Sequence, residues 1–440
     1  MKIIHKRRLY FFYIIFFLLL VGPNIKILNV EIQFWLFFFF FIHIFFAKSS
    51  QNENLKVPII FALPTILVSG SFILKSLVFS DYSDLLQCLK YAMLYCYSYT
   101  IIKITQDYPI SLIEKIAENI LKILSISVIY VSIIGILQYY NPSFLKTFFS
   151  IFYDKGYSYS SDLTSFMQAV ETNRISSIYE NAMVFGGAMS LFVLSIVVFK
   201  KKKYSLFDKT AIVLGCITIF LANTRSPMIG LLLGLSIWMI IYNRSKILIY
   251  VALIPIVLIL QREITANNQK FKELNSNRIT EITDYIASGF DSRFIPGSML
   301  SRLENIGYSI DLFSNSKYIF TGITKNYYIS VLAGRRVSFH NQFVSWIIMF
   351  GFMGFIFSLY FILLIYFLHK KIHIVKDDGL KYLLTSSLII LITAFIICLS
   401  QPALLSLRWR EFMYFYFTLI YIMYKKKIME NDKNNLIQSQ

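Results

Sequence analysis

Apolar runs close to the thickness of a lipid bilayer recur along almost the whole chain, and they constrain its fold more than any other feature. A helix of about 20 apolar residues crosses a hydrocarbon core of roughly 30 Å. The chain is 57% hydrophobic with a mean hydropathy of +0.61, whereas soluble domains are only about 45–50% apolar. We therefore predict an all-α integral membrane protein in which residues 1–440 form one polytopic domain.

Twelve such runs are predicted to be membrane-spanning helices. They lie at about Tyr10–Val21, Ile27–Phe46, Val57–Phe79, Leu85–Ile102, Ile123–Tyr139, Asn181–Phe199, Thr210–Leu221, Met228–Tyr242, Ile247–Leu260, Gln342–Leu368, Tyr382–Ser400 and Phe412–Tyr424. The first run follows Lys6-Arg7-Arg8 and has the length of a signal-peptide core, but no small-residue cleavage site follows it. We therefore expect it to remain as an anchor. The polar tail, residues 429–440, is expected to be cytoplasmic and disordered.

The net charge of +19 is explained by where the basic residues fall in the predicted topology. If the N-terminus is cytoplasmic, twelve spans place both termini there, and most lysines and arginines outside the long loops then fall in inner segments. The short outer turns hold only Lys26, Arg225, Arg408 and Arg410. This asymmetry is the positive-inside rule. The basic balance therefore indicates orientation, and no nucleic-acid partner is expected, since no soluble segment carries a basic stripe interleaved with aromatic residues.

Several classes of site are excluded by the motifs that the sequence lacks. The four cysteines, Cys88, Cys96, Cys216 and Cys398, all lie in spans and form no C-x-x-C pair, which argues against disulfides and thiolate metal sites. There is no H-E-x-x-H motif, no Walker or dinucleotide glycine motif and no G-x-S-x-G. We expect no metal ion and no cofactor.

Two long outer loops interrupt the spans, at residues 140–178 and 262–340. Structureless loops of this length are uncommon and are usually functional or disordered. From Arg262 to Phe339 there are ten basic and seven acidic residues, too balanced for a polybasic lipid patch. Within this loop Met299–Phe313 has apolar residues at helical spacing and is predicted to be a helix. The chemistry of the protein is therefore sought in the second loop.

Only one of the five histidines, His340, lies on the outer face in this topology. Histidine is the side chain best suited to acid–base chemistry near neutral pH. His340 and Asn341 stand at the mouth of the tenth span, so a histidine that only caps this helix is an equally good interpretation. The other histidines fall in the cytoplasm or near the inner end of a span.

Three arginines are candidate anion-binding residues. Arg225 lies in Asn223-Thr224-Arg225-Ser226-Pro227, where Thr224 or Ser226 can cap the next helix and Pro227 suits its first turn. A helix N-terminus and a guanidinium together favour phosphate. Arg174 ends the first long loop, and Arg302 begins the predicted helix of the second. Taken singly, each is as well explained by an interfacial anchor, a solvated loop charge or a salt bridge.

Lys75 and Lys90 are the main charges predicted to lie within spans. Ionisable residues inside a membrane often mark transport pathways. These two lysines are therefore the reason to keep a transporter as an alternative function. Both side chains are also long enough to reach the interface.

Three separated patterns resemble the O-antigen polymerase/ligase family of bacterial membrane glycosyltransferases. The first is Arg174-Ile-Ser-Ser-Ile-Tyr-Glu-Asn181, which runs into Gly186-Gly187, and the second is the turn Leu221-Ala-Asn-Thr-Arg225-Ser226. The third is Ser301-Arg302, then Tyr318-Ile-Phe-Thr-Gly322, His340-Asn341-Gln-Phe and Gly351-Phe-Met-Gly354. The chain departs from the family where Ser177 replaces a glycine, Ala182 replaces a proline, and the arginine and serine at 225–226 stand in reversed order.

The resemblance implies a GT-C-like helical architecture and a donor glycan carried on undecaprenyl diphosphate, presented at the outer leaflet of the bacterial plasma membrane. Arg302 and Arg225, with Arg174 in support, are then expected at the diphosphate. His340 is expected to orient or deprotonate the acceptor hydroxyl, and Asn341 to position the loop or the acceptor. The reaction is predicted to be a metal-independent, inverting transfer, because arginines can neutralise the leaving diphosphate.

Members of this family either polymerise glycan repeat units or ligate a finished glycan onto lipid A-core or protein. The composition favours a repeat-unit polymerase. Its donor and its acceptor are then both lipid-linked glycans, and a chain-length regulator and a flippase are the protein partners that the resemblance implies. A flippase or transporter of the same lipid-linked sugars is the alternative from another class.

Overall fold

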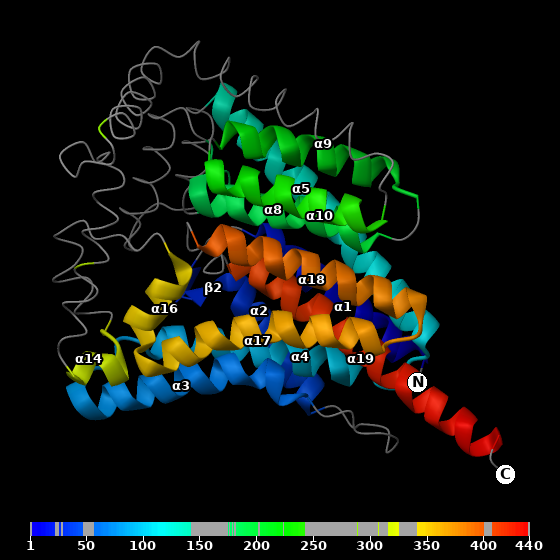
Figure 1. The fold of residues 1–440 in the computed structure, drawn as a ribbon, viewed down its shortest axis with the longest axis horizontal. Helices are drawn as coiled ribbons and strands as arrows, with labels where there is room; N and C mark the ends of the chain where they lie inside the picture. Colours follow the sequence, from blue (N-terminus) through cyan, green and yellow to red (C-terminus); the bar gives the residue numbers. More distant parts are fainter. Residues whose placement is uncertain are drawn as a thin grey trace.

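The protein is described by a computed structural model in which the placed residues form a bundle of helices (Figure 1). The structure describes residues 2–22, 26–27, 30–46, 57–141, 182–200, 203–222, 224–242, 316–324, 341–399 and 407–438, with single residues at 175, 177, 179, 288 and 307. The helices are α1 (Lys2–Val21), α2 (Ile32–Phe45), α3 (Ile59–Phe79), α4 (Leu85–Thr105), α5 (Ile110–Tyr140), α8 (Ala182–Phe199), α9 (Leu206–Leu221), α10 (Arg225–Tyr242), α14 (Ser316–Thr321), α16 (Gln342–Phe350), α17 (Phe352–Ile374), α18 (Asp378–Cys398) and α19 (Leu407–Gln438).

The helices have the length and composition of membrane spans. Among the described residues, α3, α5, α17 and α18 are each long and apolar enough to cross a bilayer. Shorter apolar stretches lie in α2, α8 and α10, at Trp35–Phe45, Val184–Phe199 and Ser226–Tyr242. Helices satisfy every backbone hydrogen bond within one segment, as lipid requires. The prediction of a largely helical membrane protein with transmembrane helices is confirmed.

Every predicted span except Ile247–Leu260 overlaps a helix of the structure; that stretch lies outside the described residues, as does the helix predicted at Met299–Phe313. Several boundaries differ; α5, for example, begins at Ile110, well before the predicted start at Ile123. The second span was expected from Ile27, but Lys26–Ile27 (β1) pairs antiparallel with Val30–Glu31 (β2) before α2 begins. The expectation of a disordered tail after Met429 is wrong, since α19 continues to Gln438.

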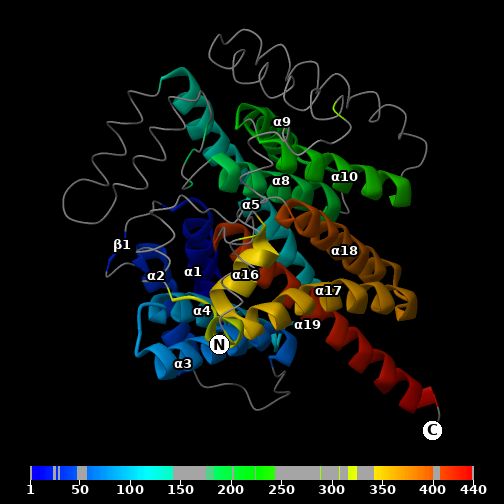
Figure 2. The same ribbon diagram turned by 60° about the vertical axis from the view of Figure 1, so that its left-hand side comes forward.

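The predicted tenth span, Gln342–Leu368, is not one helix. It is divided into α16 and α17 at Gly351, whose φ of 58° and ψ of −134° are almost restricted to glycine. A hydropathy run reports apolar content and carries no information on such a break. The consequence is that α16 leaves the line of α17 and leans away from it (Figure 2).

Close backbone contacts between glycines hold this break in place. A Cβ atom on Gly322 would lie 2.5 Å from the Met349 carbonyl oxygen, and one on Gly351 would lie 2.5 Å from the Gly322 amide nitrogen. Gly322 also has a positive φ of 71°. The next residue, Ile323, donates its N–H to the carbonyl of Ile348 at 2.9 Å. The part of the second long loop around Gly322 and Ile323 is therefore packed directly against the α16–α17 break.

The two ends of the bundle can be distinguished by the segments that lie there. Both chain termini lie toward one end, which we call the terminal end (Figure 1). The end of α5, helix α14 and the start of α16 lie at the opposite end, which we call the loop end because residues 140–178 and 262–340 begin or finish there. An even number of crossings is consistent with this arrangement.

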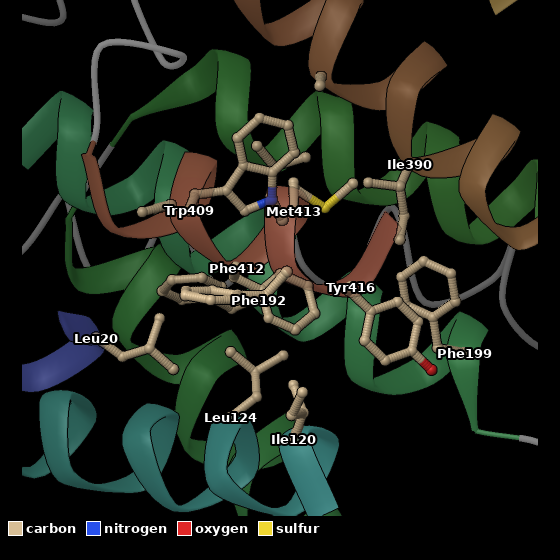
Figure 3. Packing of buried hydrophobic residues seen from close by; sticks show 14 of the residues in the cluster. Leu20, Ile120, Leu124, Phe192, Phe199, Ile390, Trp409, Phe412, Met413 and Tyr416 are labelled. Carbon is tan, nitrogen blue, oxygen red and sulfur yellow. The ribbon is translucent and has the colours of Figure 1, made fainter. Parts of the chain in front are cut away.

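Helix α19 lies at the centre of the bundle and is buried on all sides over its first turns. Trp409, Phe412, Met413 and Tyr416 contact apolar side chains of several helices (Figure 3). The labelled neighbours are Leu20 of α1, Ile120 and Leu124 of α5, Phe192 and Phe199 of α8, and Ile390 of α18. In lipid the hydrophobic effect does not drive helices together, so these contacts stabilise the bundle chiefly by dispersion and shape.

Two ion pairs with a buried partner lie within the bundle. Lys75 of α3 donates to Asp84, with 2.6 Å between Nζ and Oδ2, and lies 5.5 Å from the centroid of the Phe350 ring. At the terminal end Lys200 pairs with the buried Asp208, which also completes a capping box with Ser205 at the start of α9. Lys75 therefore joins α3 to the start of α4, a structural role that does not require a transport pathway.

The glycine contact at the helix break gives a direct stability prediction. A Cβ on Gly354 would lie 1.9 Å from the Trp346 carbonyl oxygen, so Gly354→Ala must displace backbone and should lower the free energy of unfolding by about 1–3 kcal/mol. Gly70→Ala in α3 is the matched control, because its Cβ would meet only the Met353 side chain at 3.7 Å. Thermal unfolding of the purified protein in detergent measures both. Equal melting temperatures for the two variants would contradict the contact.

Candidate functional site

The predicted site residues are only partly described by the structure. Arg174, Arg302 and His340 lie outside the described residues. Arg225 is the first residue of α10, and its side chain is not described. Asn341 is described in full. The structure therefore locates the segments that carry these residues, and the placement of the side chains stays a prediction.

Asn341 is the N-cap of α16. Its side-chain oxygen accepts hydrogen bonds from the backbone N–H groups of Phe343 (2.9 Å) and Val344 (3.2 Å). Its amide nitrogen donates to the carbonyl of Leu399, just beyond α18, at 3.1 Å. The side chain thus satisfies free groups at the start of one helix and the end of another. This geometry fixes the backbone next to His340.

Helix α16 connects the glycine contact to the predicted catalytic position. Its C-terminal end is held at Gly351, and its N-terminal end is tied by Asn341 to the chain that follows α18. The intervening Gln342 is buried, and neither its Nε2 nor its Oε1 has a hydrogen-bond partner among the described residues. Buried side-chain amides normally form hydrogen bonds. The Gln342 amide is therefore an exception among the described residues.

The first two sequence patterns meet in space. Ile175 donates its N–H to the carbonyl of Leu221 at 3.4 Å, which joins the Arg174 segment to the end of α9 just before Arg225. On the other side of this turn, a Cβ on Gly186 would lie 2.2 Å from the Thr224 hydroxyl oxygen. The Thr224 hydroxyl has no hydrogen-bond partner among the described residues, so the predicted threonine cap is not formed. Pro227 lies in the first turn of α10, as predicted.

Ser177 explains one departure from the family pattern. Its φ is 51°, in the left-handed region that favours glycine. Its N–H donates to Gln138 Oε1 at 2.7 Å, and its hydroxyl donates to the Val131 carbonyl at 2.8 Å. These two bonds to α5 offset the cost of the unfavourable backbone. The serine therefore keeps the turn that a glycine would make more easily.

Two arginines that the sequence assigned to a short outer turn are buried instead. Arg408 and Arg410 lie in the first turn of α19, and their exposed fractions are 4% and 8%. Arg408 donates to the carbonyls of Leu20 (3.0 Å) and Gly22 (2.8 Å), and so satisfies the C-terminal end of α1. The signal that was overlooked is the placement of charges at the start of an apolar run, which in a membrane protein indicates function or close pairing.

Tyr179 joins this buried cluster. Its ring centroid lies 4.9 Å from the Arg408 guanidinium carbon, a cation–π contact. Burial raises the pKa of the Tyr179 hydroxyl above its usual range. Tyr179 therefore stays protonated at physiological pH and is not a candidate base. The first long loop thus ends against the start of α19.

Metal and thiol chemistry receive no support from the described residues. No group of three or more histidine, cysteine, aspartate or glutamate side chains is placed there to hold a metal ion. All four cysteines, Cys88, Cys96, Cys216 and Cys398, are free.

Comparison with known proteins identifies the central part of the chain. A search of curated proteins found no match. Residues 210–359 match the family model described as O-antigen ligase. This segment is less than half of the chain, and it holds Arg225, Arg302, His340, Asn341 and the glycine contact. The resemblance to the O-antigen polymerase/ligase family that was drawn from the sequence is therefore confirmed over residues 210–359.

Proposed function

We propose that the protein polymerises oligosaccharide repeat units carried on undecaprenyl diphosphate into a surface polysaccharide, an O-antigen or a capsule, at the outer face of the plasma membrane. The observation that carries the proposal is the family match over residues 210–359. The described framework adds support: the Asn341 cap fixes the residue that follows the predicted acid–base position, and glycine packing fixes the other end of α16.

The proposed chemistry is an inverting transfer. An acceptor hydroxyl attacks the anomeric carbon on the face opposite the diphosphate, the new C–O bond forms, and the bond to the diphosphate oxygen breaks with its electron pair. His340 accepts the hydroxyl proton, and Arg302, Arg225 and Arg174 neutralise the charge that develops on the leaving undecaprenyl diphosphate. Asn341 positions the loop that carries His340. This scheme needs no metal ion.

The proposed topology has twelve spans in a GT-C-like arrangement. The terminal end of the bundle then lies in the cytoplasm, since the last turn of α17 carries Lys371, which lies over Tyr424 of α19 just before Lys425 to Lys427. The loop end faces the periplasm or the extracellular space, and the reaction takes place on that side. The lipid bilayer, a flippase that delivers substrate and a chain-length regulator are the partners that this placement implies.

Polymerase and ligase are two versions of the same reaction with different acceptors, and the composition favours the polymerase. A flippase of lipid-linked sugars is the candidate from another class. It needs polar groups along a path through the bundle, whereas the described core is dominated by aromatic and aliphatic side chains, and Lys75 is paired with Asp84. No observation favours the flippase.

Replacing His340 or Arg302 by alanine should reduce glycan transfer roughly 100-fold or more, because a proton acceptor or a counter-charge for the diphosphate is lost. His369→Ala is the matched control, since His369 is exposed on the terminal part of α17. Glycan ladders from complemented cells measure the effect, and membrane insertion is checked by immunoblot. Full activity of a properly inserted His340→Ala protein would refute the assignment.

Deletion of the gene separates polymerase from ligase. Loss of a polymerase leaves glycan of a single repeat unit on the cell surface, because ligation and export continue. Loss of a ligase leaves no surface glycan, because the polymer stays attached to its lipid carrier in the plasma membrane. Gel analysis of surface polysaccharide from the deletion strain should show the single-repeat form. Its absence would overturn the polymerase proposal in favour of the ligase.

A further inference from the structure

An apolar groove of about 670 Å³ runs between α17 and α19. Its walls include Phe357, Phe361 and Leu364 of α17 and Met413 and Phe417 of α19. Parts of α3, α4 and α18 complete the lining. We call this space the α17–α19 groove. Its interior is hydrocarbon-like and carries few polar atoms, so its ligand must present a large apolar surface.

One end of the α17–α19 groove carries a buried cation. The guanidinium carbon of Arg410 lies 4.7 Å from the centroid of the Tyr91 ring, and Trp346 of α16 lines the same end. Arg410 Nε and Nη2, the Tyr91 hydroxyl and the Trp346 indole nitrogen are buried without a well-formed hydrogen bond among the described residues. Several donors therefore converge where the groove ends.

The surroundings of Arg410 differ from those of Arg408, only two residues away. Arg408 donates hydrogen bonds to the carbonyls of Leu20 and Gly22. No carboxylate among the described residues pairs with Arg410. A buried guanidinium without a counter-charge is costly in lipid. An anion bound at this point would remove that cost.

The dimensions of the groove indicate a long amphiphile. From Arg410 to Lys425, both of which line the groove, α19 rises by about 22 Å at 1.5 Å per residue, a large part of the roughly 30 Å hydrocarbon core. The end of the groove that carries Arg410, in the first turn of α19, lies toward the loop end of the bundle. Trp346, which lines it, follows Asn341 on α16 by about one and a half helical turns.

We propose that Arg410 binds the diphosphate of a polyprenyl diphosphate lipid whose isoprenoid chain lies in the α17–α19 groove. This inference rests on the proposed function, and it adds a binding residue outside the family-matched segment. A single unsaturated chain fits a groove between two helices that is lined mainly by aromatic and branched side chains. The bidentate guanidinium matches phosphate oxygens, and the head group then lies beside the helix that follows His340.

Binding of two probes to the purified full chain in detergent tests the proposal. The probes are undecaprenyl diphosphate without sugar and undecaprenol, which has the same chain and no charge. Arg410→Gln should weaken binding of the diphosphate about 10-fold or more and leave undecaprenol within about 2-fold. Arg410→Lys should be intermediate, because a lysine keeps the charge and loses the planar fork.

A second pair of variants tests the groove itself. Leu364→Trp fills it and should weaken binding of both probes, whereas the adjacent Leu363→Trp should change neither, since Leu363 is 52% exposed and lies outside the groove. Thermal unfolding of each variant establishes that it is folded. If a folded Arg410→Gln protein binds undecaprenyl diphosphate as tightly as the unchanged protein, the assignment of Arg410 is wrong.

Two further outcomes are informative. Phosphatidylglycerol that displaces undecaprenyl diphosphate at equal concentration would make the groove a general phospholipid site and overturn the proposal. His340→Ala should retain probe binding, because it acts on the acceptor. Arg410-dependent binding in a protein that transfers no glycan would uphold the lipid site and refute the proposed function, so the two can fail separately.

Discussion

The contact between Gly322 and Gly351 is the constraint on which the rest of the site depends. Any side chain at either position would collide with backbone of the other segment. The contact breaks the tenth apolar run, turns α16 away from α17 and fixes the C-terminal end of α16, while the hydrogen bond from Asn341 to the Leu399 carbonyl fixes its N-terminal end. The N-cap of α16 is then Asn341, the residue after the predicted base His340, and the middle of the helix brings Trp346 to the α17–α19 groove. The backbone conformation at Gly351 thereby orients a helix that runs from the predicted site at the loop end to the groove inside the bundle.

Helix α19 makes the second link between membrane and site. It is buried on all sides at its start, where Arg408 completes the end of α1 and Arg410 faces the groove. Charges at this depth are tolerated only with partners. Arg408 has carbonyl partners from the protein, and for Arg410 we propose a lipid phosphate. The same short segment would then serve stability through one arginine and substrate binding through the other.

The sequence predicted the helices well and the site only in outline. Apolar length alone located almost all the spans, because a bilayer admits helices of nearly fixed length. It missed the break at Gly351, since hydropathy does not report φ. It assigned Arg408 and Arg410 to a short outer turn, because a charge next to an apolar run marks the end of the run and carries no information on burial. Asn341 was recognised as a positioning residue, and the structure describes it as a helix cap. Arg174, Arg302 and His340 stay predictions.

The most direct test of the account is reconstitution of the purified protein in liposomes with one synthetic undecaprenyl-diphosphate-linked repeat unit and no other protein. The account predicts a ladder of lipid-linked products that grows by whole repeat units, because donor and acceptor are the same molecule and the chemistry needs only this chain. If the substrate remains unpolymerised, the result contradicts a polymerase. If the unpolymerised substrate crosses to the opposite leaflet, the result favours a transporter.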